Sequence, residues 1–233
     1  MTQLKLAFSI LMIFCLCGVS AVSANDADTT AYSVYDTASF SVEYPSNWDA
    51  ERSLATELGG WEYEFINVDF DSVDPSDPDV NDVILHQINL IIGADIIVLA
   101  IVSTLNTVES GYLDEPTQHF LDTLTFKNSG TDVANVSDNI TYVPYDSVYF
   151  SVEHPRGWIN DTTPYGDGIM YFFADQDTSN ITMLSVRFGT QEIMAGQTLE
   201  ILSLGVLAPG DSVSRGKFEE PVLHFFDTLM FKM

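Results

Sequence analysis

Short stretches in which apolar and polar residues alternate recur along the chain and predict half-buried β-strands. Residues 40–43 read Phe-Ser-Val-Glu, and residues 150–153 repeat the same four residues. A proline follows each stretch, at Pro45 and at Pro155, where the missing backbone N–H would end a strand. We therefore expect one strand to end near each proline.

Two later runs, residues 83–92 and 96–104, are crowded with Ile, Val and Leu and are separated by Gly-Ala-Asp. This spacing predicts a β-hairpin with a short turn. The alternative is one membrane-spanning helix over residues 83–102. That helix would place Asp95 near its centre at a cost of about 2.5 to 3.5 kcal/mol, so the hairpin is favoured. In the second half, we expect the corresponding strands at residues 169–174, 181–188 and 198–208.

Each half of the chain ends with a predicted amphipathic helix. Pro116 and Pro221 suit the first helical turn, where a missing N–H costs nothing. Apolar residues then recur at spacings of three and four, as on a helix that packs on a sheet: Phe120, Leu121 and Leu124, then Phe225, Phe226 and Leu229. His119 and His224 occupy matching positions, and we expect a packing or capping role for both.

These elements recur because the sequence is duplicated. Residues 32–48 and 142–158 share nine of seventeen positions, and residues 111–127 and 216–232 share ten of seventeen. The predicted fold class is α+β: two tandem repeats, each a mainly antiparallel β-sheet packed against a C-terminal helix. The repeats span residues 31–127 and 142–233, and residues 128–141, rich in Asn, Ser, Thr and Asp, form the linker.

The N-terminus carries an export signal. Lys5 precedes an apolar run over residues 6–16, and Val-Ser-Ala at residues 22–24 is a small-residue cleavage site. Residues 1–24 are therefore predicted to be a signal peptide, and the protein to be secreted or held at the cell envelope. The alternative is an uncleaved membrane anchor over residues 4–22. Both cysteines lie inside this segment, so the mature chain has no disulfide.

The charge balance excludes several partners. Lys and Arg number 8 against 34 Asp and Glu, which gives a formal net charge of -26. Such a surface repels nucleic acid phosphates and anionic lipid head groups. We expect no nucleic acid partner, and membrane association only through an uncleaved N-terminal segment or through another protein.

An acidic segment in the first repeat contains weak candidate ligands for calcium, which prefers carboxylate oxygens: Asp69, Asp71, Asp74, Asp77, Asp79 and Asp82. The pattern of a helix-loop-helix calcium loop fails in two places. Asp82 stands where Gly is needed, and Ile88 stands where Glu is needed. A solvated loop explains the same residues. No other cofactor is predicted.

Four Asn-x-Ser/Thr sequons are candidate glycosylation sites, which we expect on exposed loops: Asn135, Asn139, Asn160 and Asn180. Motifs for enzymes are missing, because the sequence has no Gly-x-Ser-x-Gly elbow and no phosphate-binding Gly loop. Glu43 with Glu153, and Asp122 with Asp227, recur between the repeats. A capping or pairing role is favoured for them over acid–base catalysis. The sequence thus predicts a protein that is not an enzyme.

The opening strand and the closing helix of each repeat resemble the PsbP-like domain, which is named for an extrinsic subunit of photosystem II. The residues that carry the resemblance are 40–48 with 120–126, and 150–158 with 225–231. The resemblance implies an antiparallel sheet flanked by helices, and a non-catalytic role as an accessory or scaffold on a larger assembly. It assigns no ligand-binding residue.

The function that these patterns favour is that of an exported, non-catalytic accessory protein that docks on a cell-envelope or membrane assembly. One alternative is a Ca²⁺-dependent extracellular binding module that uses residues 69–82. The other is a hydrolase with an unrecognised carboxylate pair.

Overall fold

A computed structural model describes residues 31–69, 84–105, 111, 113–127, 140–175, 181–192, 198–214 and 216–232. The predicted signal peptide, the alternative anchor over residues 4–22 and most of the linker lie outside these ranges. No helix among the described residues is long and apolar enough to cross a membrane.

The two halves of the chain contain the same elements in the same order. The first half runs through β1 (Tyr32–Asp36), β2 (Phe40–Pro45), β3 (Asp49–Ala55), β4 (Gly60–Asp69), β5 (Ile84–Ile92), β6 (Ile96–Thr104), α2 (Glu115–Thr123) and β7 (Thr125–Phe126). The second half runs through β8 (Tyr142–Asp146), β9 (Phe150–Pro155), β10 (Ile159–Tyr165), β11 (Gly168–Ala174), β12 (Met183–Glu192), β13 (Thr198–Pro209), α3 (Glu220–Thr228) and β16 (Met230–Phe231). Two short strands, β14 (Val213–Ser214) and β15 (Lys217–Phe218), precede α3.

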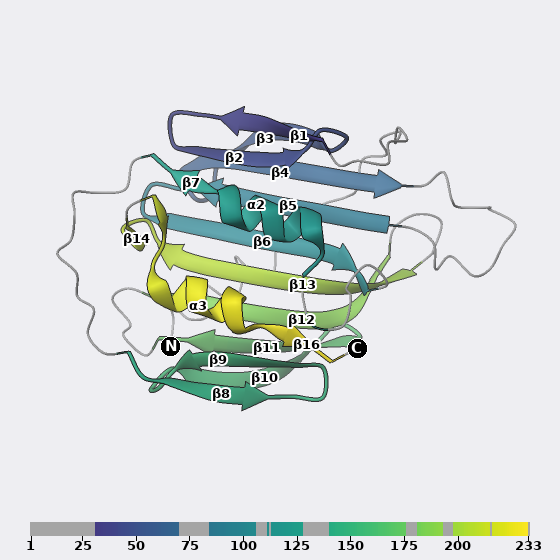
Figure 1. Cartoon of the computed structure of the whole chain (residues 1–233), viewed down its shortest axis with the longest axis vertical. Coiled ribbons are helices and arrows are strands. Elements are labelled where there is room, and N and C mark those ends of the chain that lie inside the picture. The colour runs from purple at the N-terminus through teal and green to yellow at the C-terminus, as the bar shows by residue number, and fades with distance from the viewer. Residues whose placement is uncertain are drawn as a thin grey trace, which may run out of the picture.

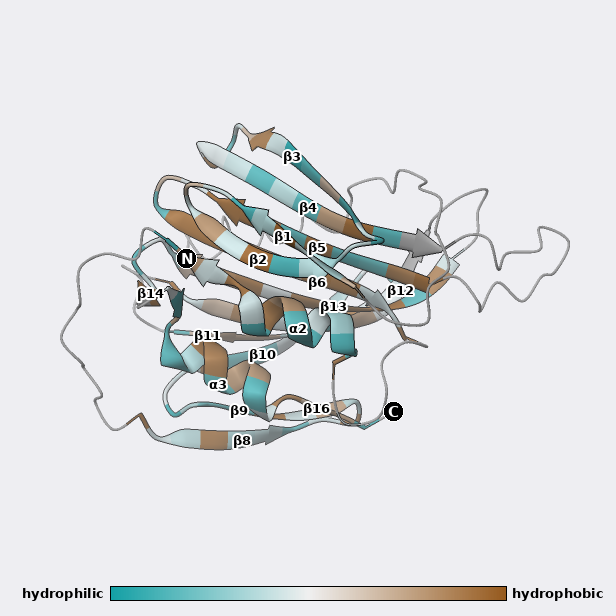
Figure 2. Cartoon of the chain, turned by 45° about the horizontal axis from the view of Figure 1, so that its top comes forward, coloured by the Kyte–Doolittle hydropathy of each residue, from teal (hydrophilic) through white to brown (hydrophobic). Residues whose placement is uncertain are grey.

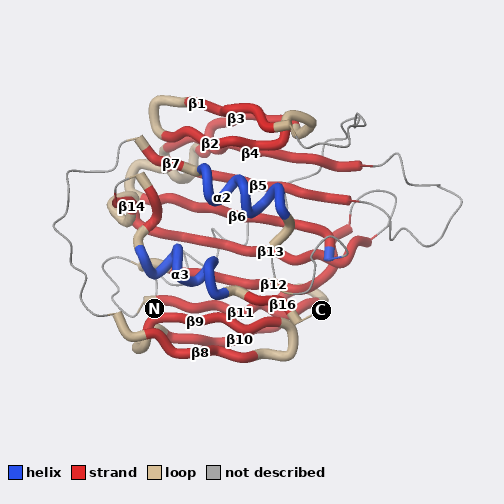
Figure 3. The backbone as a smooth tube through the Cα atoms, in the orientation of Figure 1, coloured by secondary structure: helices blue, strands red, loops and turns tan. Residues whose placement is uncertain are grey.

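The predicted fold class is wrong, because the structure is mostly β and the two halves share their main sheet. This sheet has eight strands in the order β10-β11-β12-β13-β6-β5-β4-β3 (Figure 1). Separate small sheets are formed by β1-β2-β7 and by β16-β9-β8. The described helices are only nine residues each, so strands dominate (Figure 3). Separate sheets would have left β6 and β13, which are buried along most of their length, as unpaired edges.

The junction between the halves lies on a pseudo-twofold axis. Strands β6 and β13 pair antiparallel over nine residue pairs, and Ala100 pairs with Gly205 at the centre. These two residues are 105 positions apart, which is also the offset between the two closing helices. Two backbone hydrogen bonds between the halves join the same pair of equivalent positions, once on each side of the axis. The N–H of Phe126 donates to the carbonyl of Gly216, and the N–H of Gly111 donates to the carbonyl of Phe231.

Both helices and both small sheets cover the same face of the eight-stranded sheet (Figure 1). The helices are amphipathic (Figure 2), and their aromatic side chains anchor them to the sheet. Phe120 of α2 contacts Phe65, with ring centroids 5.0 Å apart, and Phe225 of α3 contacts Phe173 at 5.4 Å. The resulting core runs without interruption through both halves.

Most of the predicted elements are confirmed. Strands β2 and β9 end at Pro45 and Pro155, and helices α2 and α3 begin one residue before their prolines. The runs expected as a hairpin are β5 and β6, which overturns the membrane-helix alternative for residues 83–102. Strands β1, β3, β4, β8 and β10 were missed, as were the two-residue strands β7, β14, β15 and β16. Most residues of β3 and β10 are exposed, so these strands have no regular apolar alternation.

We predict that a defect in one half unfolds both halves. A Cβ on Gly168 would lie 2.0 Å from the carbonyl oxygen of Phe188, so Gly168→Ala should cost about 2 kcal/mol. Because the sheet is shared, this loss should appear in the first half as well. Denaturant unfolding would be followed by fluorescence in two backgrounds, in which Trp48 or Trp158 is the only tryptophan.

The expected result is the same downward shift of the midpoint for both probes. The control is Ser53→Ala on the exposed strand β3, which should change the free energy of unfolding by less than about 0.5 kcal/mol. An unchanged Trp48 transition in Gly168→Ala would show that the two halves unfold independently.

Candidate functional site

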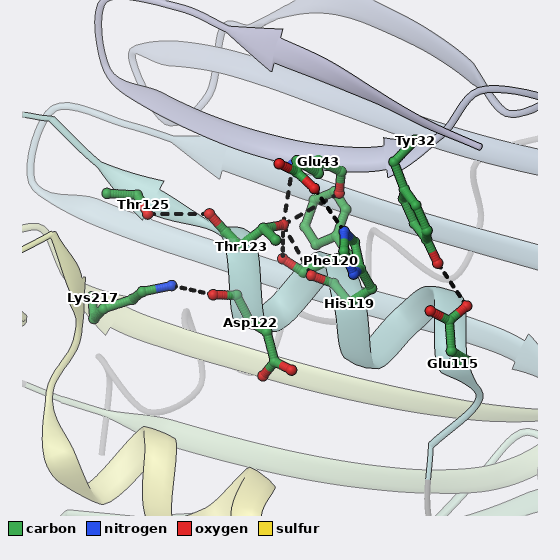
Figure 4. Close-up of polar contacts among 9 residues, drawn as sticks. All are labelled: Tyr32, Glu43, Glu115, His119, Phe120, Asp122, Thr123, Thr125 and Lys217. Atoms are coloured by element: carbon green, nitrogen blue, oxygen red, sulfur yellow. Dashed lines mark hydrogen bonds and ion pairs between the residues drawn. The ribbon is translucent and has the colours of Figure 1, made fainter. Parts of the chain in front are cut away.

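A cluster of titratable side chains joins α2 to the first hairpin (Figure 4). The imidazole of His119 stacks on Tyr32, with ring centroids 3.7 Å apart, and its Nε2 lies 2.9 Å from Oε2 of Glu43. The Tyr32 hydroxyl donates to Glu115 at 2.6 Å. Burial, together with this carboxylate, raises the pKa of Tyr32 well above its usual value, so the hydroxyl remains a hydrogen-bond donor.

The second half repeats this cluster. His224 stacks on Tyr142 with a centroid separation of 3.7 Å, and its Nε2 lies 2.9 Å from Oε2 of Glu153. The Tyr142 hydroxyl donates to Glu220. The same four residues, one His, one Tyr and two Glu, therefore make the same contacts in both halves.

A threonine completes each cluster and explains its purpose. The backbone N–H of Glu43 donates to Oγ1 of Thr123 at 3.1 Å, and that hydroxyl donates to the carbonyl of His119 at 2.9 Å (Figure 4). In the second half, the N–H of Glu153 donates to Oγ1 of Thr228 at 3.0 Å. Each cluster thus fastens the outer hairpin to its helix, from the first helical residue to the last, which is the packing role expected for the two histidines.

Two of the four candidate acid–base residues belong to these clusters, and the other two, Asp122 and Asp227, are exposed on α2 and α3. Glu43 and Glu153 are bound to histidines, and Asp122 accepts from the side-chain amide of Gln118 at 3.0 Å. The pairing of each Glu with a His was missed at the sequence level. A signal was present, because both residue types recur at matching positions in both repeats.

A second histidine–carboxylate contact is confined to the first repeat. Nδ1 of His86 on β5 lies 2.9 Å from Oδ2 of Asp114, and both side chains are about one-tenth exposed. Trp48 stacks on the imidazole at a centroid distance of 5.6 Å. The other carboxylate oxygen of Asp114 accepts from the N–H of Thr117 and caps α2. Burial alone would raise the pKa of Asp114, but these partners outweigh it and lower the pKa.

The equivalent position at the start of α3 lacks this role. Glu219 precedes the helix as Asp114 does, but its side chain makes no capping hydrogen bond. Burial raises the pKa of Glu219, so the environment at this helix start differs from that around Asp114.

His154 is the second buried histidine among the described residues, and its hydrogen bonds are to uncharged groups. Its Nδ1 lies 3.1 Å from the carbonyl of Pro155, and its Nε2 lies 3.3 Å from the side-chain amide of Asn160. This arrangement fits a neutral ring that donates through Nδ1 and accepts at Nε2. Burial lowers the pKa of His154, which keeps the ring neutral.

An open pocket of about 560 Å³ lies at one end of the sheet in the first repeat. The turns that follow β3, β5 and β13 meet there. Its larger side chains are apolar: Leu54, Trp61, Ile92, Ile97, Phe126 and Val213. Ser39 and Thr56 add two hydroxyl groups, and the remaining lining residues are glycine and alanine. None of the described residues that line this pocket has an ionisable side chain.

Most of the predicted calcium ligands and sequons lie outside the described residues. These are Asp71, Asp74, Asp77, Asp79, Asp82, Asn135, Asn139 and Asn180. Asp69 ends β4, and Asn160 is exposed on the edge strand β10 and not on a loop. The described residues contain no group of three or more His, Cys, Asp or Glu that could hold a metal ion. Calcium binding and glycosylation remain predictions.

No family model, no curated protein and no solved structure matches this chain. The resemblance to the PsbP-like domain therefore also remains a prediction.

We predict that Asp114 stabilises the first repeat much more than Glu219 stabilises the second. Asp114→Ala removes the helix cap and leaves His86 buried without its partner, so it should cost about 3 kcal/mol. Glu219→Ala is the matched control and should cost less than about 0.5 kcal/mol. Denaturant unfolding at neutral pH measures both. Equal losses in the two variants would contradict a special role for the buried pair.

We also predict that His154 makes the free energy of unfolding depend on pH. The pKa of His154 is lower in the folded than in the unfolded chain. Its contribution to the free energy of unfolding is therefore complete above about pH 6.5 and is lost as the pH falls through the lowered pKa. His154→Tyr, which copies Tyr44 of the first repeat, should reduce the loss of stability between about pH 7.5 and about pH 5.5. The reciprocal Tyr44→His should increase it. The measurement is the free energy of unfolding at both pH values, and an unchanged difference in both variants would refute the assignment.

Proposed function

We propose that this protein is an exported, non-catalytic interaction protein that docks on an assembly at the cell envelope. The observation that carries the proposal is the separation between its titratable groups and its open pocket. The repeated His–Glu–Tyr clusters are engaged in fastening hairpins to helices, whereas the pocket is lined only by uncharged residues.

Catalysis by proton transfer needs an acid or base that faces the bound substrate within hydrogen-bonding distance. Among its described lining residues, the pocket offers only the hydroxyl groups of Ser39 and Thr56, and none of the other lining side chains is an acid or a base that could activate a hydroxyl. Its chemistry suits the exclusion of water around an apolar group, which is how a protein interface gains affinity.

The fold also suits a docking protein. Its pocket stands on the shared eight-stranded sheet, whose central strands are almost fully buried. A surface on such a framework changes little between the free and the bound state. The acidic surface keeps the exported protein soluble and directs it to partners of opposite charge.

The proposal is tested by capture from native envelopes. The tagged mature chain would be cross-linked to its neighbours, and the products would be quantified with and without an excess of the untagged chain. We expect one set of proteins to be captured saturably and to be displaced by the competitor. If no protein is displaced, then the chain has no specific partner in the envelope and the proposal is wrong.

A further inference from the structure

We propose that the pocket of the first repeat is the docking site, and that it takes an apolar side chain carried by a basic segment of the partner protein. This inference rests on the proposed function, because it names where the partner binds and which chemistry it presents. Four observations carry it: the exposed apolar lining, the connected turns at the rim, the closed state of the equivalent place in the second repeat, and the charge of the chain.

The pocket exposes large apolar side chains that a monomer has no reason to leave in water. Trp61 is 40% exposed and Leu54 is 63% exposed, and they pair across strands β4 and β3. The guanidinium carbon of Arg52 lies 3.4 Å from the centroid of the Trp61 ring and covers one of its faces. Tryptophan and arginine are enriched among the residues that dominate the binding energy of protein interfaces.

The rim of the pocket is already in place without a ligand. The N–H of Ala94 donates to the carbonyl of Leu58 at 3.4 Å, which ties the turn after β5 to the turn after β3. The N–H of Gly210 donates to the carbonyl of Asp95 at 2.9 Å, which ties the turn after β13 to the turn after β5. Three turns from distant parts of the sequence are thus already joined. Binding of a partner would therefore cost little free energy for ordering these turns.

The second repeat provides an internal comparison, since its backbone makes the same close approach. A Cβ on Gly60 would lie 2.0 Å from the carbonyl oxygen of Ile92, and a Cβ on Gly168 would lie 2.0 Å from that of Phe188. Ile92 and Phe188 are therefore equivalent positions, each followed by a glycine.

The side chains at and around these equivalent positions differ, and the difference leaves a pocket in the first repeat and fills the equivalent space in the second. Tyr149 precedes β9 as Ser39 precedes β2, and its ring stacks on Phe188 with centroids 4.8 Å apart. In the first repeat, Ser39 has no ring to lay over Ile92, and both residues line the pocket. The first repeat has thus kept open the space that an aromatic pair occupies in the second.

The uncharged lining and the net charge of the chain constrain the occupant. The described lining residues are uncharged, and the nearby guanidinium of Arg52 is stacked on the Trp61 ring, so the part of the occupant that is buried in the pocket is uncharged. The chain as a whole carries a net charge of -26, so the flanks of the partner segment are basic. An aromatic or aliphatic side chain between Lys or Arg residues meets both conditions.

The test exchanges the residues that distinguish the two repeats. Ser39→Tyr closes the pocket with the residue that the second repeat carries, and Trp61→Ile copies Ile169 of the second repeat. Tyr149→Ser is the matched control, because it changes the second repeat only. Each variant would first be shown to unfold cooperatively, and both pocket substitutions copy residues that the same fold already accommodates.

The probe is the peptide acetyl-Lys-Gly-Phe-Gly-Lys-amide, titrated into the mature chain and followed by the backbone amide signals of Gly60 and Gly93. We expect saturable shifts with the wild type and with Tyr149→Ser. Ser39→Tyr and Trp61→Ile should weaken binding at least tenfold. A peptide with Gly in place of Phe should not bind, and one with Glu in place of Lys should bind several-fold more weakly at low salt. Equal binding by Ser39→Tyr would overturn the inference.

The same variants would be used as bait in the envelope capture. Loss of the captured proteins with Ser39→Tyr, and their retention with Tyr149→Ser, is the expected outcome. If the wild type and Ser39→Tyr capture the same proteins, then the pocket is not the docking site, although the chain is still an interaction protein. If the wild type captures nothing, then the proposed function itself fails.

Discussion

The antiparallel pairing of β6 with β13 is the interaction on which the rest of the structure depends. Each half alone would end in a long strand with an unpaired edge, and such edges promote aggregation unless they are covered. The nine residue pairs between β6 and β13 remove both edges at once. The small residues Ala100 and Gly205 pair at the centre of the junction, where the pseudo-twofold axis passes. The two copies of the duplicated sequence therefore share one sheet and one continuous core.

This symmetric framework explains which features recur and which do not. The His–Glu–Tyr clusters recur because each half must fasten its own hairpin over the sheet, and the residues of each cluster come from one half only. The features that differ lie away from the axis: the contact between His86 and Asp114, the buried His154, and the end of the sheet near Ser39. A duplicated protein can change such positions in one copy while the other copy and the shared sheet maintain stability. The asymmetric positions are therefore where a specific function is expected.

Local elements could be predicted from the sequence because their signals are local. Prolines and alternating residues marked β2 and β9, and dense β-branched runs marked β5 and β6. The joined sheet could not be predicted in this way, since it depends on pairing between residues about one hundred positions apart, and a repeat by itself suggests two separate domains. The pocket was hidden for a similar reason. The difference between Ser39 and Tyr149 has no meaning until Phe188 is known to lie beneath the tyrosine ring.

The duplication also helps to distinguish structural from functional histidines. A catalytic pair would have to act on a substrate, and a pocket that lies mainly in one repeat gives no reason to preserve the contacts of such a pair in the other repeat. His119 and His224 keep identical centroid and Nε2–Oε2 distances in both halves, although the described pocket is lined mainly by the first half. The geometry of these two histidines is therefore explained by the fold that both halves share and not by the pocket. Trp61 and Ser39, by contrast, are replaced in the second repeat by Ile169 and Tyr149. The fold therefore does not require Trp61 or Ser39, and this is why we propose that they serve binding.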